Sequence, residues 1–304
     1  MSKLPLALTC GDPAGVGPEL IASWLKAHPD AHSNVVIIGP SNWLKTLGLP
    51  SSAQIAVGPA DYKVVAGQPD DTGSNIALAA MEQAADGVLH GKFCAVVTGP
   101  INKKCFSKIG YRFPGQTEFF AQRWNGNPVM AFAGGKLTVG LVTWHIPLEQ
   151  VAKKLTRSDI RKTVLALVHL RQKLGDKNPR IAVCGINPHA GENGLLGSED
   201  DAIIRPEIEA LRAEGYAVSG PLPGDTVFYR HQQGEFDAVV AIYHDQGLAP
   251  LKLVDFSSSA NLTLGLKYIR TSPDHGTAYE IAGQGRADRG SLDSAIKLAN
   301  ALSA

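Results

Sequence analysis

The sequence predicts an α/β fold. Short apolar runs rich in β-branched residues alternate with longer amphipathic stretches, which is the pattern of strands and helices taking turns along the chain. The composition, 44% hydrophobic and 19% charged, is that of an ordinary globular protein and excludes general disorder. With 304 residues, the chain is long enough for two domains of roughly 150 residues or for one large α/β domain.

Six runs predict the strands. Several of them are apolar throughout, which indicates burial on both faces of a largely parallel sheet. The predicted strands are 4–9, 34–38, 93–98, 137–143, 180–186 and 237–242.

Seven longer stretches have the spacing of helices. The clearest is 158–174, where Ser158 is a plausible N-cap and the apolar residues fall on one face. Pro18 suits the first helical position of the helix that begins at residue 17. The predicted helices are 17–27, 73–89, 116–124, 148–154, 158–174, 200–214 and 290–303.

Charge and hydropathy exclude several classes of function. Lys and Arg number 29 against 28 Asp and Glu, a net charge of +1, and no basic run is present, which argues against a nucleic-acid-binding face. No window approaches the roughly 20 apolar residues of a membrane span, and the N-terminal apolar stretch is too short for a signal peptide. We therefore expect a cytoplasmic protein.

The four cysteines show no CxxC spacing, which favours free thiols over disulfides or a zinc knuckle.

Three histidines share one context. His145, His189 and His244 each lie just past the carboxyl end of a predicted buried strand, the edge at which α/β sheets bind ligands. Three imidazoles with an open position would form a Lewis-acid site for a metal such as zinc. Glu192 and Asp245 could orient two of these rings. A structural role for the histidines, and a turn or solvated role for the two carboxylates, are the alternatives.

An anion site is predicted from Thr117, Lys252, Asn261 and Arg270. Gly115 to Glu118 has the character of a turn into a helix whose free N–H groups could face a phosphate. Lys252 and Arg270 are isolated cations in segments of apolar or small residues, where a charge needs a partner. A structural salt bridge is the alternative. The glycine-rich segment 11–19 lacks the GxGxxG spacing and predicts a sharp strand-to-helix turn at a cleft.

Taken together, seven segments in order resemble the 4-hydroxythreonine-4-phosphate dehydrogenase family of vitamin B6 biosynthesis. Any one of them would be weak, but the ordered set is highly specific. They include GDPAGVGPEL, INPHAGE and YHDQGLAPLK, and they cover 11–20, 98–103, 113–120, 186–192, 220–226, 243–252 and 261–285.

The resemblance implies a two-lobed α/β/α fold like that of isocitrate and isopropylmalate dehydrogenases, with a cleft between the lobes. The first lobe would comprise 1–125 plus 256–304, and the second 126–255. It further implies a homodimer whose active sites are shared, with the metal ligands drawn from both subunits. No nucleic acid or membrane partner is implied.

The resemblance also assigns site residues. The metal ligands match His145, His189 and His244, and the metal would be one zinc, cobalt or magnesium ion per site. Substrate contacts carry over to Gln116, Thr117, Lys252, Asn261 and Arg270, although the family usually has His where this chain has Gln116. The cofactor, NAD or NADP, would lie on His275, Gly276, Thr277 and Ala278.

The implied reaction is oxidation of 4-phosphohydroxy-L-threonine to a 3-oxo acid, which loses carbon dioxide to give 3-amino-1-hydroxyacetone 1-phosphate on the route to pyridoxal phosphate. Asp225 and Lys103 are the candidates for the general base. Two other functions stay open: a related NAD-dependent dehydrogenase of another hydroxy acid, and a metal-dependent hydrolase using the same histidines.

Overall fold

The computed structural model describes residues 4–303, which form two compact units. Unit 1 contains the chain up to Asn127 and again from Leu266 onward, and unit 2 is Pro128–Gly265. The second junction, after Gly265, lies ten residues after the boundary at 255 that the resemblance implied. The reason is that the segment after residue 255 first adds a strand, β10 (Ala260–Leu264), to unit 2, where it pairs with β5 (Val129–Ala133).

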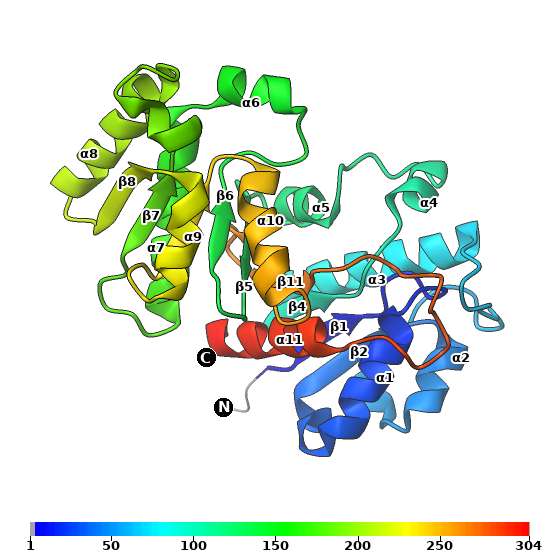
Figure 1. The fold of residues 1–304 in the computed structure, drawn as a ribbon. Coiled ribbons are helices and arrows are strands. Elements are labelled where there is room, and N and C mark those ends of the chain that lie inside the picture. The colour runs from blue at the N-terminus through cyan, green and yellow to red at the C-terminus, as the bar shows by residue number, and fades with distance from the viewer. Residues whose placement is uncertain (1–3, 304) are drawn as a thin grey trace. The chain divides into compact units, whose positions relative to one another are not determined.

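Within unit 1, the described residues form five neighbouring strands of sheet, drawn as arrows in Figure 1. Their order is β3-β2-β1-β4-β11, and every neighbouring pair is parallel. Four of these strands are buried over most of their length, whereas the short edge strand β3 is not. Apolar runs predicted β1, β2 and β4, but β11 was not predicted because most of its residues are polar. The strands are β1 (Leu6–Thr9), β2 (Val35–Gly39), β3 (Gln54–Ala56), β4 (Ala95–Thr98) and β11 (Ile269–Pro273).

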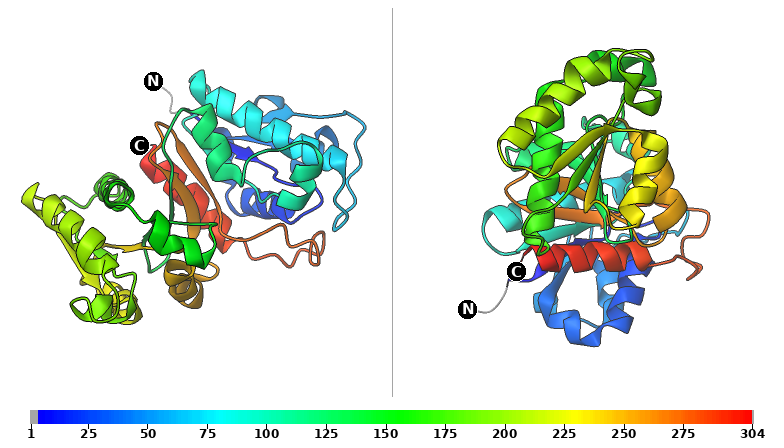
Figure 2. Two further views of the ribbon diagram at one scale, coloured as in Figure 1. Left: turned by 90° about the horizontal axis from the view of Figure 1, so that it is seen from above. Right: turned by 60° about the vertical axis from the view of Figure 1, so that its left-hand side comes forward.

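Helices cover both faces of the unit 1 sheet. In Figure 2, α1 and α11 lie on one side of the strands and α3 lies on the other. The core on the α3 side holds an aromatic group that includes Phe106, Phe119, Phe120 and Trp124. The helices are α1 (Gly17–Ala27), α2 (Ser41–Leu44), α3 (Asp71–Leu89), α4 (Lys103–Lys108), α5 (Gln116–Arg123) and α11 (Gly290–Leu302).

Unit 2 has a mixed sheet in the order β10-β5-β6-β9-β7-β8. Strand β5 runs antiparallel to both of its neighbours, and the other pairs are parallel. The register aligns Leu141 of β6 with Ala241 of β9, so the chain leaves both strands at the same edge. The remaining strands are β6 (Val139–Leu141), β7 (Ile181–Cys184), β8 (Val218–Leu222) and β9 (Ala238–Ala241).

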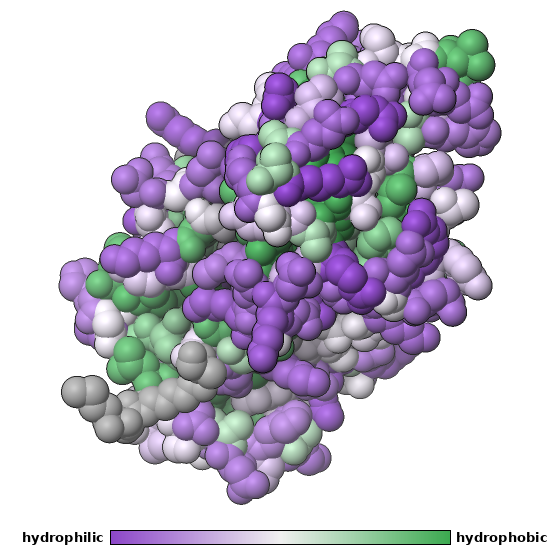
Figure 3. All heavy atoms as spheres, turned by 90° about the vertical axis from the view of Figure 1, so that its left-hand side faces the viewer, coloured by the Kyte–Doolittle hydropathy of each residue, from purple (hydrophilic) through white to green (hydrophobic). Residues whose placement is uncertain are grey.

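Helices again cover both faces of the unit 2 sheet. Helix α7 packs on one side, and α9 and α10 pack on the other (Figures 1 and 2). The helices are α6 (Leu148–Lys154), α7 (Arg157–Lys173), α8 (Arg205–Ala213), α9 (Gly224–Gln232) and α10 (His244–Asp255). Of the described residues, none belongs to a helix that is long and apolar enough to span a bilayer. The face seen in Figure 3 is largely hydrophilic, with hydrophobic side chains in separate patches.

All six predicted strands and all seven predicted helices form, with differences at their ends. The N-cap of α7 is Thr156 and not Ser158, because the Thr156 hydroxyl accepts the Asp159 N–H at 3.1 Å and donates to the Asp159 carboxylate at 2.6 Å. The predicted helix 200–214 is a π-helical turn, Asp200–Ile204, followed by α8.

The four cysteines are free thiols, as predicted. Cys10 and Cys184 are buried, whereas Cys94 and Cys105 are only partly buried. Burial raises the pKa of both the Cys10 and the Cys184 thiol, so these two side chains stay protonated and unreactive.

Candidate active site

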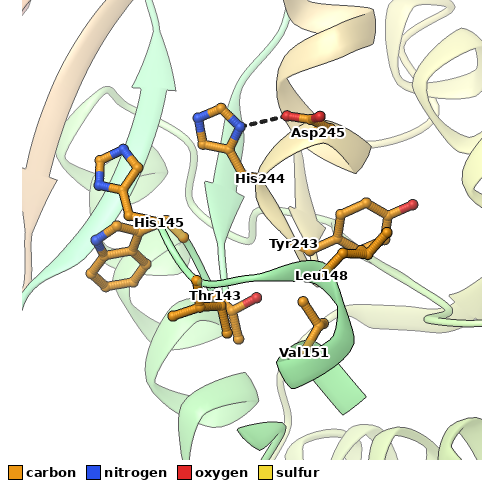
Figure 4. A pocket seen from close by; sticks show the side chains of 9 residues that line it. Thr143, His145, Leu148, Val151, Tyr243, His244 and Asp245 are labelled. Atoms are coloured by element: carbon orange, nitrogen blue, oxygen red, sulfur yellow. Dashed lines mark hydrogen bonds and ion pairs between the residues drawn. The ribbon is translucent and has the colours of Figure 1, made fainter. Parts of the chain in front are cut away.

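Two of the three candidate metal ligands lie side by side in unit 2. His145 follows β6 and His244 begins α10 directly after β9, and because these strands are parallel neighbours, both side chains emerge at one edge of the sheet. Their ring centroids are 5.7 Å apart (Figure 4). The backbone of His145 has a φ of +50°, a conformation that non-glycine residues adopt only when their surroundings impose it.

A cavity of about 500 Å³ adjoins this pair of imidazoles. Asp245 fixes the His244 ring, because its Oδ1 lies 2.6 Å from His244 Nδ1, and this leaves Nε2 as the nitrogen available to a metal. This contact is the one that the predicted orienting role of Asp245 requires. The cavity is lined by Thr143, Trp144, His145, Ile146, Leu148, Val151, Tyr243, His244 and Asp245.

His189 lies on an unusual turn. The residues from His189 to Gly194 all have positive φ, between +43° and +89°, so they form a left-handed helical turn although only two of them are glycine. Each non-glycine residue in this conformation costs about 1–2 kcal/mol, and such strain concentrates at functional sites. Glu192 closes the turn on His189, with its Oε1 2.6 Å from His189 Nδ1, and this hydrogen bond raises the pKa of His189.

Asp200 holds the base of this turn. The Asp200 side chain is fully buried, and its carboxylate accepts the backbone N–H groups of Ile186 at 2.9 Å and Asn187 at 3.2 Å. It also accepts the Asn187 side-chain amide at 2.9 Å. No room exists for a side chain at Gly185, where a Cβ would come within 2.7 Å of both the Asp200 carboxylate and Ala190. Asp200 was not predicted, because nothing in the local sequence distinguishes it from its acidic neighbours Glu199 and Asp201.

His189 does not join the other two histidines within the described chain. It lines a second cavity of about 550 Å³ with Asp225, Gln246 and others, and this cavity shares only Tyr243 with the first one. Within residues 4–303, no cluster of three His, Cys, Asp or Glu side chains is arranged to hold a metal. The structure thus brings together two of the three predicted ligands and places the third beside Asp225, a candidate general base.

In unit 1, Arg270 is a buried cation held by hydrogen bonds. Its side chain is 4% exposed, and it donates from Nη2 to Thr98 Oγ1 at 2.7 Å and to Gln116 Oε1 at 3.0 Å. Burial lowers the pKa of Arg270 to about 10, so the guanidinium remains charged at neutral pH. The Thr98 hydroxyl and the Gln116 amide oxygen are neutral acceptors that fix the orientation of the guanidinium.

Gln116 begins α5 and is held at both ends. Its Nε2 donates to the Gly99 carbonyl at 3.0 Å, while its Oε1 accepts from Arg270. Thr117, the next residue, is buried in the first turn of α5. The Lys103 ammonium lies nearby, 3.8 Å from where a Cβ on Gly115 would be. Four predicted residues, Lys103, Gln116, Thr117 and Arg270, are therefore gathered in unit 1.

The two remaining substrate candidates belong to unit 2. Asn261 is buried in β10, opposite Phe132 of β5. Lys252 lies near the end of α10, with its Nζ 5.3 Å from the centre of the Phe256 ring.

The predicted cofactor residues lie in unit 1, on the loop between β11 and α11. Thr277 is buried, Ala278 has a φ of +43°, and His275 Nε2 is a buried ring nitrogen with no hydrogen-bond partner among the described residues. A buried polar atom without a partner fits a position that a polar ligand fills. Tyr279 of this loop also donates to Asp12, which lies between β1 and α1, and neither residue was predicted to be part of the site.

Known proteins resemble the chain over its full length. The family model described as pyridoxal phosphate biosynthetic protein PdxA matches residues 26–299. A 4-hydroxythreonine-4-phosphate dehydrogenase of Chromobacterium violaceum is 40% identical, over 99% of this chain and 98% of that protein. A crystal structure of the dehydrogenase of the same name from Klebsiella pneumoniae has a TM-score of 0.85 and 36% identity, with full coverage of both chains.

Two more distant structures mark the limits of this likeness. A terephthalate 1,2-cis-dihydrodiol dehydrogenase from Burkholderia xenovorans has a TM-score of 0.71 and 28% identity, covering 98% of both chains. An isocitrate dehydrogenase from Methylococcus capsulatus has a TM-score of 0.51 and 14% identity over 98% of this chain and 87% of that one. The second likeness concerns the fold alone, and it bears out the predicted fold class.

Proposed function

The chain belongs to the pyridoxal phosphate biosynthetic protein PdxA family of dehydrogenases, and from this premise we propose that it oxidises 4-phosphohydroxy-L-threonine with NAD or NADP and a divalent metal. The 3-oxo acid formed by this oxidation loses carbon dioxide and yields 3-amino-1-hydroxyacetone 1-phosphate. The observation that carries the proposal is the pair of imidazoles, His145 and His244, at one sheet edge with their ring centroids 5.7 Å apart. We place this reaction in the cytoplasm.

The side chains fit a borderline metal. His145 and His244 present imidazoles, and the Asp245 carboxylate leaves His244 Nε2 for a ligand bond. Imidazole donors suit zinc or cobalt better than magnesium, which prefers oxygen ligands. When bound, the metal polarises the substrate hydroxyl and the later ketone, and the nicotinamide accepts the hydride.

We propose that the third ligand comes from a second copy of the chain. His189 is held apart from the His145–His244 pair although all three lie in unit 2, and the Glu192 carboxylate orients it as Asp245 orients His244. A homodimer that exchanges His189 would complete three imidazoles in each site. Unit 2 also exposes large apolar side chains that an interface would cover, namely Leu148, Leu195, Tyr229, Leu253 and Phe256.

The substrate phosphate is assigned to the unit 1 residues. Arg270 is a buried side chain that stays charged at neutral pH, and Thr98 and Gln116 fix its orientation. The first turn of α5, which starts at Gln116 and Thr117, adds N–H groups of the kind that bind anions. Lys252 and Asn261 are proposed to contact the remaining polar groups of the substrate.

Asp225 and Lys103 are retained as candidates for the general base. Asp225 lies in the cavity of His189, which would bring it to the metal in the shared site. Lys103 lies over the start of α5, beside the proposed phosphate contacts. Unchanged turnover in both Asp225→Asn and Lys103→Ala would remove the two side chains from the reaction.

A second substrate class is favoured by one residue. Gln116 cannot become cationic, and the terephthalate dihydrodiol dehydrogenase, whose substrate name contains no phosphate, shares the fold at 28% identity. A dehydrogenase of another hydroxy acid is therefore the second candidate. The dehydrogenase names of the relatives give no comparable support to a hydrolase.

The test is the formation of reduced nicotinamide. Protein freed of metal is mixed with 4-phosphohydroxy-L-threonine and NAD or NADP, and absorbance of the reduced cofactor is followed before and after zinc or cobalt is added. We expect metal-dependent reduction with an equal amount of carbon dioxide. Reduction only with a non-phosphorylated hydroxy acid would establish the second candidate, and no reduction with any hydroxy acid would refute both.

A further inference from the structure

The loop proposed to hold the cofactor has little structure of its own. It connects β11 with α11 over residues 274–289, and only three weak turns, such as Ile281 N–H to Ala278 O at 3.1 Å, occur within 278–284. Few of its side chains are buried, Thr277 and Ala282 among them. Burial of apolar side chains therefore contributes little to the conformation of this loop, and other contacts must fix it.

Asp12 holds the middle of the loop. It follows β1 and is fully buried, although a buried carboxylate is costly unless its oxygens are used. Both oxygens are used here: Tyr279 Oη donates to Oδ2 at 2.6 Å, and the Ala14 N–H donates to Oδ1 at 2.9 Å. Burial raises the pKa of Asp12, and the hydrogen bond from Tyr279 acts in the opposite direction.

The backbones of the two segments also meet directly. The Val16 N–H donates to the Thr277 carbonyl at 2.9 Å. Gly15 allows this approach, since a Cβ at that position would come within 2.8 Å of the Thr277 carbonyl oxygen. Residues 277–279 therefore pack directly against the turn between β1 and α1.

Glu19 holds the far end of the loop. It lies in the first turn of α1, and its Oε2 accepts the N–H groups of Gly283 at 2.8 Å and Gly285 at 3.3 Å. Both glycines have positive φ, at +77° and +65°, so the chain curls around the carboxylate in a conformation that other residues rarely adopt.

We propose that Asp12 and Glu19 are positioning residues that hold the loop 275–285 in its cofactor-binding conformation. This inference rests on the proposed function, because it takes the loop as the cofactor site. The two carboxylates act on the loop at Tyr279 and at Gly283 and Gly285, on the C-terminal side of the predicted contacts His275 to Ala278. They themselves need not touch the cofactor.

Binding of NADH, without turnover, tests the inference on the metal-loaded full chain. Tyr279→Phe removes the hydroxyl that reaches Asp12, and Glu19→Ala removes the acceptor of both glycine N–H groups. We expect the Kd for NADH to rise about ten-fold in each variant, the effect of one hydrogen bond to a charged group. Glu19→Gln, whose amide oxygen can still accept, should restore most of the affinity. Tyr216→Phe and Glu209→Gln are matched controls with unchanged Kd.

Two further readouts separate positioning from general stability. In the enzyme assay, KM for the nicotinamide cofactor should rise, while kcat at saturating cofactor and the KM of the hydroxy acid stay within about two-fold. In cofactor-free protein, amide hydrogen exchange should accelerate over 277–285 in both variants and not in the controls.

The outcomes are distinct. An unchanged Kd in Tyr279→Phe and Glu19→Ala overturns the inference, and so does a lower melting temperature without faster exchange in the loop. If the unaltered protein binds neither NADH nor NADPH, the proposed function itself fails and the inference falls with it. Weaker binding in both variants, with rescue by Glu19→Gln, supports the inference.

Discussion

Gln116 sets how the proposed phosphate site responds to pH. Its amide accepts from Arg270 and donates to Gly99, two roles that a neutral side chain fills at any pH. A histidine at this position could accept from Arg270 only while neutral, and on protonation it would add a positive charge beside the guanidinium. At position 116 this chain therefore has a contact that does not titrate.

Gln116→His should make the site dependent on pH. We expect the KM for 4-phosphohydroxy-L-threonine in the variant, divided by that of the unaltered protein, to fall by about three-fold or more between pH 8 and pH 5.5, because the new imidazole titrates near pH 6.5. Steady-state kinetics across this range measure it. The titration of the substrate phosphate cancels in the ratio. A ratio that stays constant with pH would show that residue 116 does not contact the phosphate.

At the scale of elements, His231 connects three parts of unit 2. It lies in the last turn of α9, and its Nδ1–H donates to the Phe236 carbonyl at 2.8 Å, just before β9. Its Nε2 accepts the Thr138 N–H at 2.9 Å, at the start of β6. Because one ring nitrogen donates and the other accepts, the ring must be neutral in the folded protein. Burial lowers the pKa of His231 accordingly.

The stability of the fold should therefore decrease in mild acid. The unfolded imidazole has a pKa near 6.5, and the folded one a lower pKa, so below pH 6.5 the unfolded chain binds a proton that the folded chain does not. The free energy of unfolding should fall by up to about 1.4 kcal/mol per pH unit from pH 6.5 down to the folded pKa, and no further below it.

Urea unfolding of the unaltered protein and of His231→Gln, from pH 8 to pH 5, measures this effect. The Gln side chain can still accept the Thr138 N–H but does not titrate, so its unfolding free energy should lack this part of the pH dependence. Other titrating groups are common to both proteins and cancel in the difference. Identical pH profiles would contradict the assignment.

At the scale of the whole molecule, the proposed metal site lacks its third imidazole within residues 4–303 of one chain. His145 and His244 form a pair, and His189 projects from a left-handed turn elsewhere in unit 2. Exchange of His189 between two copies would complete both sites with a single symmetric contact, as is usual for homodimers.

Mixing of inactive variants tests this exchange. His145→Ala and His189→Ala should each be inactive alone, but after joint refolding half of the dimers are mixed, and each mixed dimer has one intact site. We therefore expect about one quarter of the unaltered activity. A mixture of His145→Ala with His244→Ala is the control and should stay inactive, because both residues come from the same copy in every site. No recovery in the first mixture would refute the exchange.

The sequence predicted most clearly those strands and helices whose signal has a single local cause. Unbroken apolar runs predicted the strands β1, β4, β7 and β9, and all four are fully buried. Helix α10 was missed because its signals conflict: it contains Gly247 and Pro250, which interrupt a helical pattern, and only packing on β6 and β9 decides in its favour. Strand β10 was missed because Asn261 and Thr263 are polar, and pairing with β5 is what makes it a strand.

For the candidate site too, some features follow from the local sequence and others only from the tertiary structure. By itself, the sequence determined the fold class and singled out the candidate site side chains, because strand-end histidines and ordered motifs are local features of the chain. Three contacts were decided by the tertiary structure alone. His145 packs beside His244 while His189 lies apart from them. Arg270 donates hydrogen bonds to Thr98 and Gln116, and Tyr279 donates one to Asp12, 267 positions away in the sequence. These contacts depend on which strands lie side by side and on how loops fold back over the sheet, and the register of distant segments leaves no mark in the local sequence.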